Sequence, residues 1–596
     1  MSAATSPEVM LASGRSPLLA AFNAAGVLGL ADVHTAEALA RIGGEHDEQV
    51  ALALALAVRA LRQGSVCIDL SRVRHAVFES DDQLADLDHL PWPEPHGWLE
   101  ACGASPLAVE TGPLRLSGDL LYLERYWRQE ELVRSELQSR FAVAPPVVDE
   151  VTLAAALERL FPGGDLPAGT EDRQRLAAAT SAGRWVTVLA GGPGTGKTTT
   201  VARLLALLRA QPGRPVRVAL AAPTGKAAAR LEEAVRGAAD RLPAEDRERL
   251  GELSASTLHR LLGWRPDARS RFRHDAANRL PHDVVVVDEM SMVSLTLMAR
   301  LLEAVRPDAR LVLVGDPDQL SSVEAGAVLA DITGPAQAGP DHAAVVRLTH
   351  NWRFHGTIEE LAAAIRASDD DGTVEILRRG AADVTFAELD PDAGLEGAQE
   401  LARLVRTAAE ETRDAATTGD VAGALRAADT HRLLCAHRRG PYGVGRWGVE
   451  VEQHLARTVP GYAEDGEFYL GRPLLVTSND YEMGLYNGDT GVVVSTPEGV
   501  RAAFARGAAA TLYPPVRLDA VQSVHAMTVH RAQGSQFGTV TLVLPPPESP
   551  LLTRELLYTA VTRATDRVLV LGSEEAVRRA VRRPANRASG LRQRLG

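Results

Sequence analysis

The sequence has few cysteines, and none of them lies close to another. Cys67, Cys102 and Cys435 are the three in 596 residues, and they form no CxxC pair. This spacing argues against a structural zinc site, an iron–sulfur cluster and a disulfide framework. We therefore expect the chemistry of this chain to rest on other residue types.

The sequence also lacks a long apolar run. No stretch approaches the roughly 20 apolar residues that cross a membrane as a helix. The first residues, MSAATSPEVMLASGRSPLLAAF, contain no basic segment followed by a clean apolar core, as a secretory signal would. We expect a cytoplasmic protein that makes no membrane contact.

An excess of basic residues is absent too. The formal net charge is -13, whereas a protein that coats duplex DNA is normally basic. This charge argues against a protein that binds DNA through bulk charge alone, but it leaves room for a local basic groove.

The length of the chain predicts several domains, because 596 residues exceed what one hydrophobic core usually supports. Hydrophobic residues make up 45% and charged residues 24%, which is typical of a globular protein. The stretches VAPPVVDE and FPGGDLPAG are rich in Pro and Gly and predict a linker at about 145–168. Residues 1–145 then form an N-terminal domain, which is mainly helical up to about residue 110.

Three segments outside the central part give local predictions. ALALALAVRALRQGSVCIDL predicts a helix that ends near Gly64, followed by a short strand. GPLRLSGDLLYLERYWRQEELVRSEL predicts two short strands around a Ser-Gly-Asp turn and then a helix. The Arg-rich end, RRAVRRPANRASGLRQRLG, predicts a helix and a frayed tail.

Two α/β domains are predicted after the linker, at 168–345 and 346–596. The short apolar runs WVTVLA, VRVALAA, DVVVVDE and ARLVLVGD alternate with helical segments, which indicates a parallel sheet covered on both faces. HRLLCAH, VTLVLP and RVLVLG repeat this pattern in the second domain. Within it, GRPLLVTSNDYEMGLYNGDTGVVVS predicts a small antiparallel β insert at about 465–520, with a tight turn at residues 487–489.

The segment GGPGTGKT, residues 191–198, fits G-x-x-x-x-G-K-[ST] between a predicted strand and a predicted helix. Its glycines let backbone N–H groups face a β-phosphate, and the helix N-terminus adds its positive end. We expect Lys197 to reach the β- and γ-phosphates of ATP and Thr198 to ligate Mg²⁺. The residues predicted to bind ATP through this loop are Gly191, Gly192, Pro193, Gly194, Thr195, Gly196, Lys197, Thr198 and Thr199.

The segment VVVVDEMSMV places an acidic pair, Asp288 and Glu289, at the end of a buried strand. Burying such a pair without a partner is costly, so a functional role is expected, with a helix N-cap as the alternative. Asp288 is expected to hold Mg²⁺, and Glu289 to orient and deprotonate the attacking water. Gln319, in LVLVGDPDQL, is placed to touch both the γ-phosphate and that water.

An ordered series of motifs resembles a known family. The matching segments are EDRQRLAAA, GGPGTGKTTT, APTGKAAARL, ASTLHRLLG, VVVVDEMSMV, VGDPDQLSSVEAGAVL, LTHNWRF, LLCAHRRGPYGVGRWG, LVTSNDYEMGLYNGDTGVV, AMTVHRAQGSQF and ELLYTAVTRA. The series resembles superfamily 1 helicases of the 5′-to-3′ branch, and within them the RecD family, the alpha subunits of RecBCD (exonuclease V) complexes. The resemblance covers nearly the whole chain. It implies two RecA-like motor domains, an SH3-like β insert and an N-terminal domain that docks onto a RecC-like subunit.

This resemblance implies an ATP-dependent 5′-to-3′ helicase that moves on single-stranded DNA. It would unwind duplex DNA ends for recombinational repair in a heterotrimer with RecB-like and RecC-like subunits. Because about thirty residues follow TAVTRA, we expect nuclease activity only from the RecB-like partner.

The resemblance also implies residue roles. Gln174 is expected to read adenine, and Arg353 and Arg563 to complete the ATP site from the second motor domain, since a guanidinium suits a phosphoryl group. The residues expected to hold DNA are Thr224, Lys226, Thr257, His259, Thr528, His530, Gln533 and Ser535. Such side chains grip phosphates and sugars without reading bases, although helix capping and structural histidines are the alternatives. Aromatic residues make up only 4%, so the sequence identifies no base-stacking residue.

Several points stay open at this stage. The segment 265–280 is either a strand-separating pin or a solvated loop, and Tyr122, Tyr126 and Trp127 are either interface or core residues. A stand-alone 5′-to-3′ helicase is one alternative function, disfavoured because no helix–hairpin–helix pattern is visible. A regulatory ATPase that does not unwind is another, disfavoured by the intact acidic pair and arginines. A plasmid-transfer relaxase–helicase would need clustered histidines in the first 150 residues, which are absent.

Overall fold

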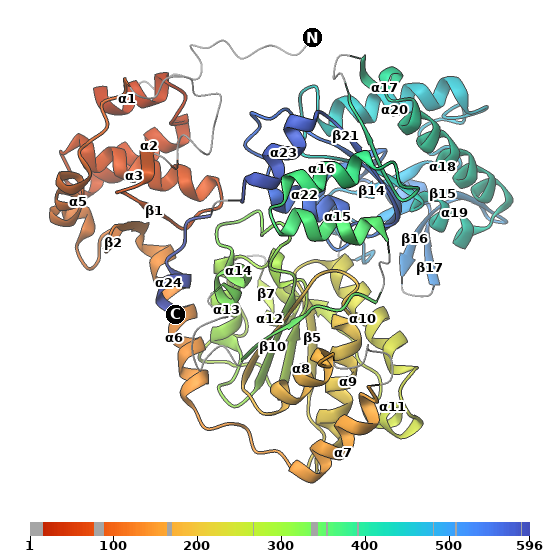
Figure 1. The fold of residues 1–596 in the computed structure, drawn as a ribbon, viewed down its shortest axis with the longest axis horizontal. Helices are drawn as coiled ribbons and strands as arrows, with labels where there is room; N and C mark the ends of the chain where they lie inside the picture. Colours follow the sequence, from red (N-terminus) through yellow and green to blue (C-terminus); the bar gives the residue numbers. More distant parts are fainter. Residues whose placement is uncertain are drawn as a thin grey trace.

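The computed structural model describes residues 16–74, 76, 89–163, 170–265, 268–334, 344–352, 356–389, 393–480, 482–506, 509–585 and 587–595. Figure 1 shows a mainly helical N-terminal domain beside two domains that are each built on a sheet. Within these described ranges, no helix is both long and apolar enough to cross a bilayer.

The N-terminal domain is built around one helix, α3 (Glu48–Arg62), in which every residue from 50 to 57 is at least mostly buried. A helix that is apolar on all sides must be covered on all sides. Its cover consists of α1 (Pro17–Ala24), α2 (Leu30–Gly43), α5 (Pro95–Ala104) and a sheet of order β1-β3-β2, with β1 at Cys67–Asp69, β2 at Leu114–Ser117 and β3 at Leu120–Leu123. The predicted helix ending near Gly64, the strand after it and the two strands around the Ser-Gly-Asp turn are all confirmed.

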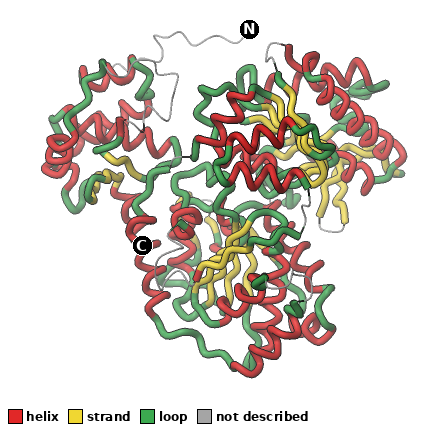
Figure 2. Tube along the Cα trace, in the orientation of Figure 1, coloured by secondary structure: helices red, strands yellow, loops and turns green. Residues whose placement is uncertain are grey.

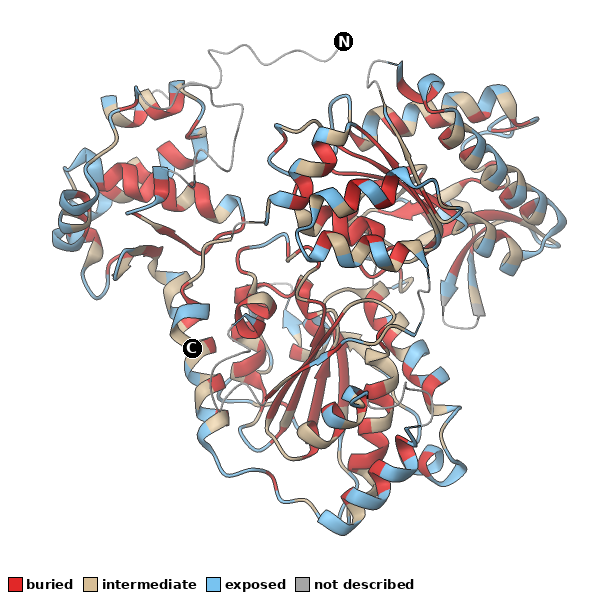
Figure 3. Cartoon of the chain, in the orientation of Figure 1, coloured by how far each residue is buried: buried red, intermediate tan, exposed pale blue. Residues whose placement is uncertain are grey.

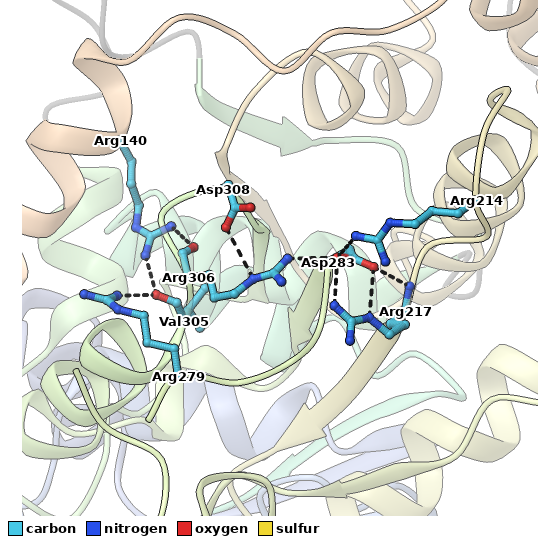
Figure 4. Close-up of polar contacts among 8 residues, drawn as sticks. All are labelled: Arg140, Arg214, Arg217, Arg279, Asp283, Val305, Arg306 and Asp308. Carbon is cyan, nitrogen blue, oxygen red and sulfur yellow. Dashed lines mark hydrogen bonds and ion pairs between the residues drawn. The ribbon is translucent and has the colours of Figure 1, made fainter. Parts of the chain in front are cut away.

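The long helix α6 (Glu124–Ala142) fastens the N-terminal domain to the first sheet domain (Figure 4). Arg140 donates hydrogen bonds to the carbonyls of Val305 (2.9 Å) and Arg306 (3.0 Å), just past the end of α13 (Leu295–Ala304). The last carbonyls of a helix have no partner within it, so the guanidinium satisfies them.

An arginine cluster lies beside this anchor, also in Figure 4. Asp283, just before β9 (Val284–Val287), accepts hydrogen bonds from Arg214, Arg217 and Arg306. Burial raises the pKa of Asp283, but these arginines outweigh it and hold the pKa well below its usual range. The cluster ties together the amino ends of neighbouring strands.

The first parallel sheet has six strands in the order β11-β4-β10-β9-β5-β6. The remaining strands are β4 (Val186–Gly191), β5 (Val218–Ala222), β6 (Ala255–Thr257), β10 (Arg310–Gly315) and β11 (Val345–Leu348). Its central strands are buried (Figure 3). Apolar cores lie on both faces, as the continuous apolar runs predict.

The helices of this domain include one in the segment for which the sequence predicts a linker. That helix, α7 (Glu150–Leu160), packs in the same core as α9 (Lys197–Ala210). The other helices over the sheet are α8 (Arg173–Ala182), α10 (Gly225–Ala239), α11 (Ala244–Leu250), α12 (Leu258–Leu262) and α14 (Val328–Thr333). Tyr122 is fully buried, and Tyr126 and Trp127 pack against the same core, so the core interpretation of these aromatics holds.

The second parallel sheet has the order β12-β21-β20-β13-β19. Its strands are β12 (Val384–Ala387), β13 (His431–Cys435), β19 (Ala526–Thr528), β20 (Phe537–Val543) and β21 (Ala564–Leu571). The helices around it are α15 (Thr357–Arg366), α16 (Asp370–Arg378), α17 (Gly394–Gly397), α18 (Gln399–Thr418), α19 (Val421–Ala428), α20 (Val444–Thr458), α21 (Val529–Ala532), α22 (Arg554–Val561) and α23 (Glu574–Arg582). Figure 2 shows both parallel sheets as strands flanked by helices.

The predicted insert is a separate antiparallel sheet of order β17-β16-β15-β14-β18. Its strands are β14 (Pro473–Val476), β15 (Thr490–Thr496), β16 (Gly499–Arg506), β17 (Ala509–Tyr513) and β18 (Val521–Ser523). The predicted tight turn is confirmed, since the amide of Asp489 donates to the carbonyl of Tyr486 (2.9 Å) and Gly488 has φ 97°. A positive φ favours glycine at this position.

The end of the chain differs from the predicted frayed tail. After α23 the segment 587–595 runs back to the N-terminal domain and ends in α24 (Leu591–Leu595). The amide of Val66 donates to the carbonyl of Ala588 (2.9 Å), Leu591 is buried, and Arg594 pairs with the buried Glu130. The tail is ordered because a buried carboxylate and an apolar pocket fix it, which a composition rich in arginine does not reveal.

Candidate active site and nucleic-acid channel

The phosphate-binding loop lies between the carboxyl end of β4 and the first turn of α9. Gly194 and Gly196 have φ of 83° and 82°, a left-handed conformation that turns backbone N–H groups inward. Lys197 donates from Nζ to the carbonyls of Gly191 (2.7 Å) and Gly192 (2.9 Å). Thr198 and Thr199 follow in the first turn of α9, where the helix N-terminus favours an anion.

Gln174, predicted to read adenine, lies against this loop. It is buried near the start of α8, and its Nε2 donates to the carbonyl of Thr195 (3.2 Å). A Cβ at position 196 would lie 2.2 Å from that same nitrogen, so only glycine leaves room for the contact. The structure thus brings Gln174 to the loop, although the hydrogen bond is to the backbone.

The acidic pair lies at the carboxyl end of β9. Burial and the charge of Glu289 raise the pKa of Asp288 to about 6, although the charge of Lys197 lowers it. Glu289 has φ 53°, one of the few non-glycine residues in the left-handed region. Such a backbone costs on the order of 1–3 kcal/mol and is found mostly at functional sites. Lys197, Asp288 and Glu289 therefore form one electrostatic unit, as the sequence predicts.

The loop after β10 joins the two sheet domains. Gln319 donates from Nε2 to Oδ2 of the buried Asp316 (3.0 Å), and the hydroxyl of Tyr558 on α22 donates to the same oxygen (3.0 Å). A Cβ at Gly192 would lie 2.9 Å from that hydroxyl, so Tyr558 also reaches the phosphate loop. Sequence reasoning missed Asp316 and Tyr558, because an Asp in a loop and a Tyr in an apolar helix carry no distinctive spacing.

Two more hydrogen bonds cross the same junction. The amide of Leu320 donates to the hydroxyl of Thr559 (2.8 Å), and Gln533 donates from Nε2 to the carbonyl of Leu320 (2.6 Å). In this structure the side chain of Gln533, predicted to hold DNA, is thus hydrogen-bonded to the loop that follows β10. The loop is therefore mechanically linked to the second domain at three side chains.

Of the two arginines predicted to complete the ATP site, the structure describes one. Arg353 lies outside the described residues. Arg563 is buried and donates to the carbonyls of Thr559 (3.2 Å) and Ser535 (3.3 Å), both in its own domain. Arg230 on α10 was not singled out from the sequence. Burial lowers its pKa, the charge of Arg563 lowers it too, and the charge of Glu289 raises it. The motif APTGKAAARL does not reveal this interaction with Glu289 and Arg563.

Five of the eight predicted strand-holding residues line one cavity of 1380 Å³. They are Thr224, Lys226, Thr528, His530 and Gln533. Thr257, His259 and Ser535 are not among its lining residues; His259 instead packs beside Phe272, with ring centroids 5.8 Å apart. The cavity therefore gathers residues from both sheet domains, as the sequence predicts for most of this set.

Helix capping, the alternative interpretation, is also correct for the threonines. The hydroxyls of Thr224, Thr257 and Thr528 each accept a hydrogen bond from the backbone amide three residues on. A hydroxyl that accepts still has one proton to donate. Capping therefore fixes the side chain and leaves a donor for a phosphate.

Lys226 is a half-buried cation beside the insert. Its Nζ lies 3.5 Å from the hydroxyl of Thr490, and burial, with the charge of Arg230, lowers its pKa to about 8. The ring of Tyr486 packs against Gly225, where a Cβ would lie 2.6 Å from Cγ of that ring. The insert therefore covers the motif that contains Thr224 and Lys226.

The segment 265–280 contains a short hairpin. β7 (Trp264–Arg265) and β8 (Ala268–Phe272) are antiparallel, and Trp264 pairs with Phe272. This hairpin follows α12 directly and agrees with the pin interpretation in its form.

Metal and thiol chemistry is limited in the parts of the chain that the structure describes. No group of three or more His, Cys, Asp or Glu residues there could hold a metal ion. Burial raises the pKa of Cys67, Cys102 and Cys435 to about 12, so none is a thiolate at neutral pH.

Comparison with known families agrees with this geometry. A family described as "AAA domain" matches residues 169–388, and one described as "UvrD-like helicase C-terminal domain" matches residues 523–571. The phosphate loop, the acidic pair and two parallel sheets define the class: the chain is an ATP-binding helicase of superfamily 1.

The family follows from longer matches. The RecD subunit of the RecBCD enzyme from Mycolicibacterium smegmatis is 52% identical over 97% of this chain and 99% of its own length. The same subunit from Mycobacterium tuberculosis is 52% identical over 99% of this chain and 98% of its own. The family "RecBCD enzyme subunit RecD, N-terminal domain" matches residues 24–122. The chain belongs to the RecD family of RecBCD enzyme subunits.

A RecD2 DNA helicase gives a weaker match. The ATP-dependent RecD2 DNA helicase of Deinococcus radiodurans is 34% identical over 68% of this chain but only 50% of its own length. The N-terminal match and the full-length matches therefore favour the complex subunit over the stand-alone helicase.

Proposed function

We propose that this chain is an ATP-driven motor that moves 5′ to 3′ along single-stranded DNA. One observation carries the proposal: strand-holding candidates from both sheet domains line a single cavity, with Thr224 and Lys226 on one side and Thr528 and His530 on the other. Two gripping surfaces on one path are what a stepping motor requires. The loop that holds Gln319 and bonds to the second domain gives the ATP site a direct connection to that path.

The ATP chemistry is assigned to the first domain. Lys197 stabilises charge on the β- and γ-phosphates, and Glu289 orients the attacking water and takes its proton. We assign Mg²⁺ to Asp288 and Thr198, because burial and the charge of Glu289 raise the pKa of Asp288 to about 6, so that a cation there would stabilise its charged form. Mg²⁺, when bound, neutralises developing charge on the phosphates.

Gln174 and Gln319 complete the site from the first domain. Gln174 is placed beside the loop to hydrogen-bond adenine, and Gln319 is held by Asp316 at the junction. We assign Arg353 and Arg563 to the transition state. The bonds of Arg563 to carbonyls in its own domain are long, so closure of the two domains can redirect it toward the phosphates.

The proposed domains are an N-terminal partner-docking domain at 1–145, a first RecA-like motor domain at 168–345 and a second at 346–596. The strands support these limits, except that β11 extends the first sheet to Leu348. In addition, α7 packs in the core of the first domain although it precedes residue 168. We propose an SH3-like fold for the insert at about 465–520, supported by its five antiparallel strands.

The proposed partners are RecB-like and RecC-like subunits and duplex DNA ends, because the relatives that match full length are named as subunits of the RecBCD enzyme. We place the complex in the cytoplasm, in recombinational repair. Co-purification of the tagged native chain tests this assignment: two large partner subunits are expected, and recovery of the chain alone would favour the stand-alone alternative.

A directional unwinding assay tests the motor itself. The native complex, with any nucleolytic activity suppressed, is given duplexes that carry a single-stranded 5′ or 3′ overhang. Comparison with a complex that contains Lys197→Ala isolates the contribution of this chain. We expect that variant to lose 5′-overhang unwinding selectively; unchanged unwinding of both substrates would contradict the proposal.

A further inference from the structure

The cavity between the domains has a charge opposite to that of the whole chain. The chain carries a formal net charge of -13, yet the cavity is lined by nine arginines and Lys226, with Asp69 as its one acidic residue among the described ones. The arginines are Arg59, Arg62, Arg72, Arg438, Arg531, Arg579, Arg582, Arg583 and Arg587. An acidic protein that concentrates cations in one hollow is built to attract a polyanion there.

Most of these arginines do not belong to the helicase motifs. Arg72 lies in the turn after β1 of the N-terminal domain, and Arg587 lies in the segment between α23 and α24. Arg438, which follows β13, and Arg531, on α21, lie in family segments of the second motor domain. The cavity thus has a third wall, formed by the N-terminal domain and the C-terminal segment, opposite the two motor domains.

The charge of the cavity is neutralised from within only in part: Arg62 pairs with Asp32 and Arg582 pairs with Asp370. Arg72, Arg438, Arg531 and Arg587 form no ion pair with a carboxylate of the described chain. Arg531 donates to the amide oxygen of Asn487 (2.7 Å), and Arg587 donates to the carbonyl of Glu324 (3.1 Å). Both partners are neutral groups.

The cations also repel one another. Burial lowers the pKa of Arg531, and the charge of Arg438 lowers it further. Burial and the charge of Arg587 lower the pKa of His530. Clustered cations without counter-charge are unfavourable in the free protein, and an anion that enters would relieve this cost.

The wall is also held in place. The amide of Ala588 donates to the hydroxyl of Ser65 (3.1 Å), the amide of Val66 donates to the carbonyl of Ala588, and Arg594 pairs with Glu130. These contacts fix the segment that directly follows Arg587 to the N-terminal domain. A fixed cation loses little freedom when it binds a phosphate.

The size of the cavity points to a polymer. Its 1380 Å³ exceeds the roughly 300–1,000 Å³ of small-molecule sites. None of the phosphate-loop residues lines it, so it is separate from the ATP pocket. A strand with repeated phosphates can contact several arginines at once, which a single small anion cannot do.

We propose that the N-terminal domain and the C-terminal segment form the third wall of the single-strand path. On this wall Arg72 and Arg587 bind backbone phosphates, together with Arg438 and Arg531 of the second motor domain. This inference rests on the proposed motor function and extends it: domains outside the motor core grip the same strand. It gives the N-terminal domain a nucleic-acid role in addition to partner docking.

The salt dependence of binding tests the wall. A fluorescent oligothymidylate is titrated with the native complex at several NaCl concentrations, for wild type and for Arg72→Gln, Arg438→Gln and Arg587→Gln. Each lost phosphate contact lowers the slope of log K against log salt by about 0.7 for a single strand. We expect that decrease for each variant, with weaker affinity at low salt.

A matched control is Arg406→Gln on α18, an exposed arginine that does not line the cavity. It should leave the slope unchanged. Arg72 and Arg438 are exposed, so their variants should fold even if Arg587→Gln lowers the melting temperature. As a second readout, an oligonucleotide with 4-thiothymidine is irradiated with the complex, and peptides that contain residue 72 or 587 should carry the cross-link.

The outcomes separate the wall from the motor. Unchanged slopes in Arg72→Gln and Arg587→Gln, together with weakened binding in Lys226→Ala, would overturn the wall and leave the motor standing. Loss of a partner subunit with unchanged oligonucleotide binding would make this face a protein-docking surface and overturn the wall as well. Unchanged binding in Lys226→Ala, together with unchanged slopes in the arginine variants, would reject both proposals.

Discussion

The edge strands of the two parallel sheets carry the same short pattern in different surroundings. β6 and α12 contain Ala-Ser-Thr-Leu-His-Arg at 255–260, and β19 and α21 contain Ala-Met-Thr-Val-His-Arg at 526–531. In both, the threonine caps the short helix through the amide three residues on. Yet Thr528, His530 and Arg531 line the basic cavity, whereas Thr257 and His259 do not.

This difference shows that local sequence fixes a side chain's geometry, while tertiary structure decides what it faces. In the first domain the helix is followed by the β7–β8 hairpin, and His259 packs beside Phe272. In the second domain the helix faces the N-terminal domain and the C-terminal segment across the cavity. One repeated element therefore serves two places along the proposed strand path.

The largest expected effect concerns the phosphate loop, which is the clearest difference between the two domains because only the first domain carries it. Lys197→Ala removes the cation that faces both the loop and Asp288. We expect DNA-stimulated ATP hydrolysis by this chain to fall by at least about 100-fold, because one preorganised charge contributes on that order. A steady-state phosphate-release assay in complexes whose other ATP sites are inactivated measures it; turnover within a few-fold of wild type would contradict the site assignment.

The next effect concerns the cation that the first domain contributes to the cavity. Lys226 has a pKa of about 8 in the free protein, and a bound phosphate would raise it. The complex with DNA then binds more protons than the free chain above pH 8, so affinity falls as pH rises. We expect about a tenfold loss of oligothymidylate affinity between pH 7 and pH 9.

Lys226→Arg is the control for this pH effect, because a guanidinium stays charged throughout that range. Its pH dependence should be flat. An equally steep dependence in this variant would assign the effect to another group.

A smaller effect concerns how the two domains are coupled. Tyr558→Phe removes one of the two hydrogen bonds to Oδ2 of the buried Asp316 and leaves Thr559 as the side chain of α22 that bonds to the loop after β10. A buried hydrogen bond of this kind contributes about 1–3 kcal/mol when its partner is left unsatisfied. We expect DNA stimulation of ATP hydrolysis to fall by roughly five- to tenfold, measured as the ratio of rates with and without oligonucleotide.

The smallest expected effect concerns the threonines of the two repeated elements, and it compares these elements directly. Thr257→Val and Thr528→Val each remove a helix cap, at a cost of about 1 kcal/mol. Their melting temperatures should fall by similar amounts. Oligothymidylate affinity, however, should fall about fivefold more in Thr528→Val, since only that hydroxyl faces the cavity. Equal losses of affinity would show that both elements grip the strand alike.

The sequence predicted the sheets and the phosphate site well, because these features rest on local patterns. Continuous apolar runs such as 284–287 specify buried parallel strands, and the glycines at 194 and 196 specify left-handed turns. The acidic pair was found because it directly follows one such run.

What the sequence could not predict depends on contacts between distant segments. Tyr558 reaches Gly192 and Asp316 across a domain boundary, and the electrostatic interaction of Arg230 with Glu289 depends on where α10 lies. The tail from 587 to 595 was expected to fray because its arginines resemble a solvated segment. Its partners, Glu130 and the backbone of Val66, lie more than 400 residues away in the chain.

Direction of movement on a single strand tests the central claim most directly. Oligonucleotides that carry biotin at one end are bound to streptavidin and incubated with ATP and the native complex. Either motor of such a complex could displace the streptavidin, so Lys197→Ala identifies the contribution of this chain. We expect ATP-dependent release of streptavidin from the 3′ end that disappears in Lys197→Ala. Release from the 3′ end that is unaffected by Lys197→Ala, or no release there at all, would contradict the account.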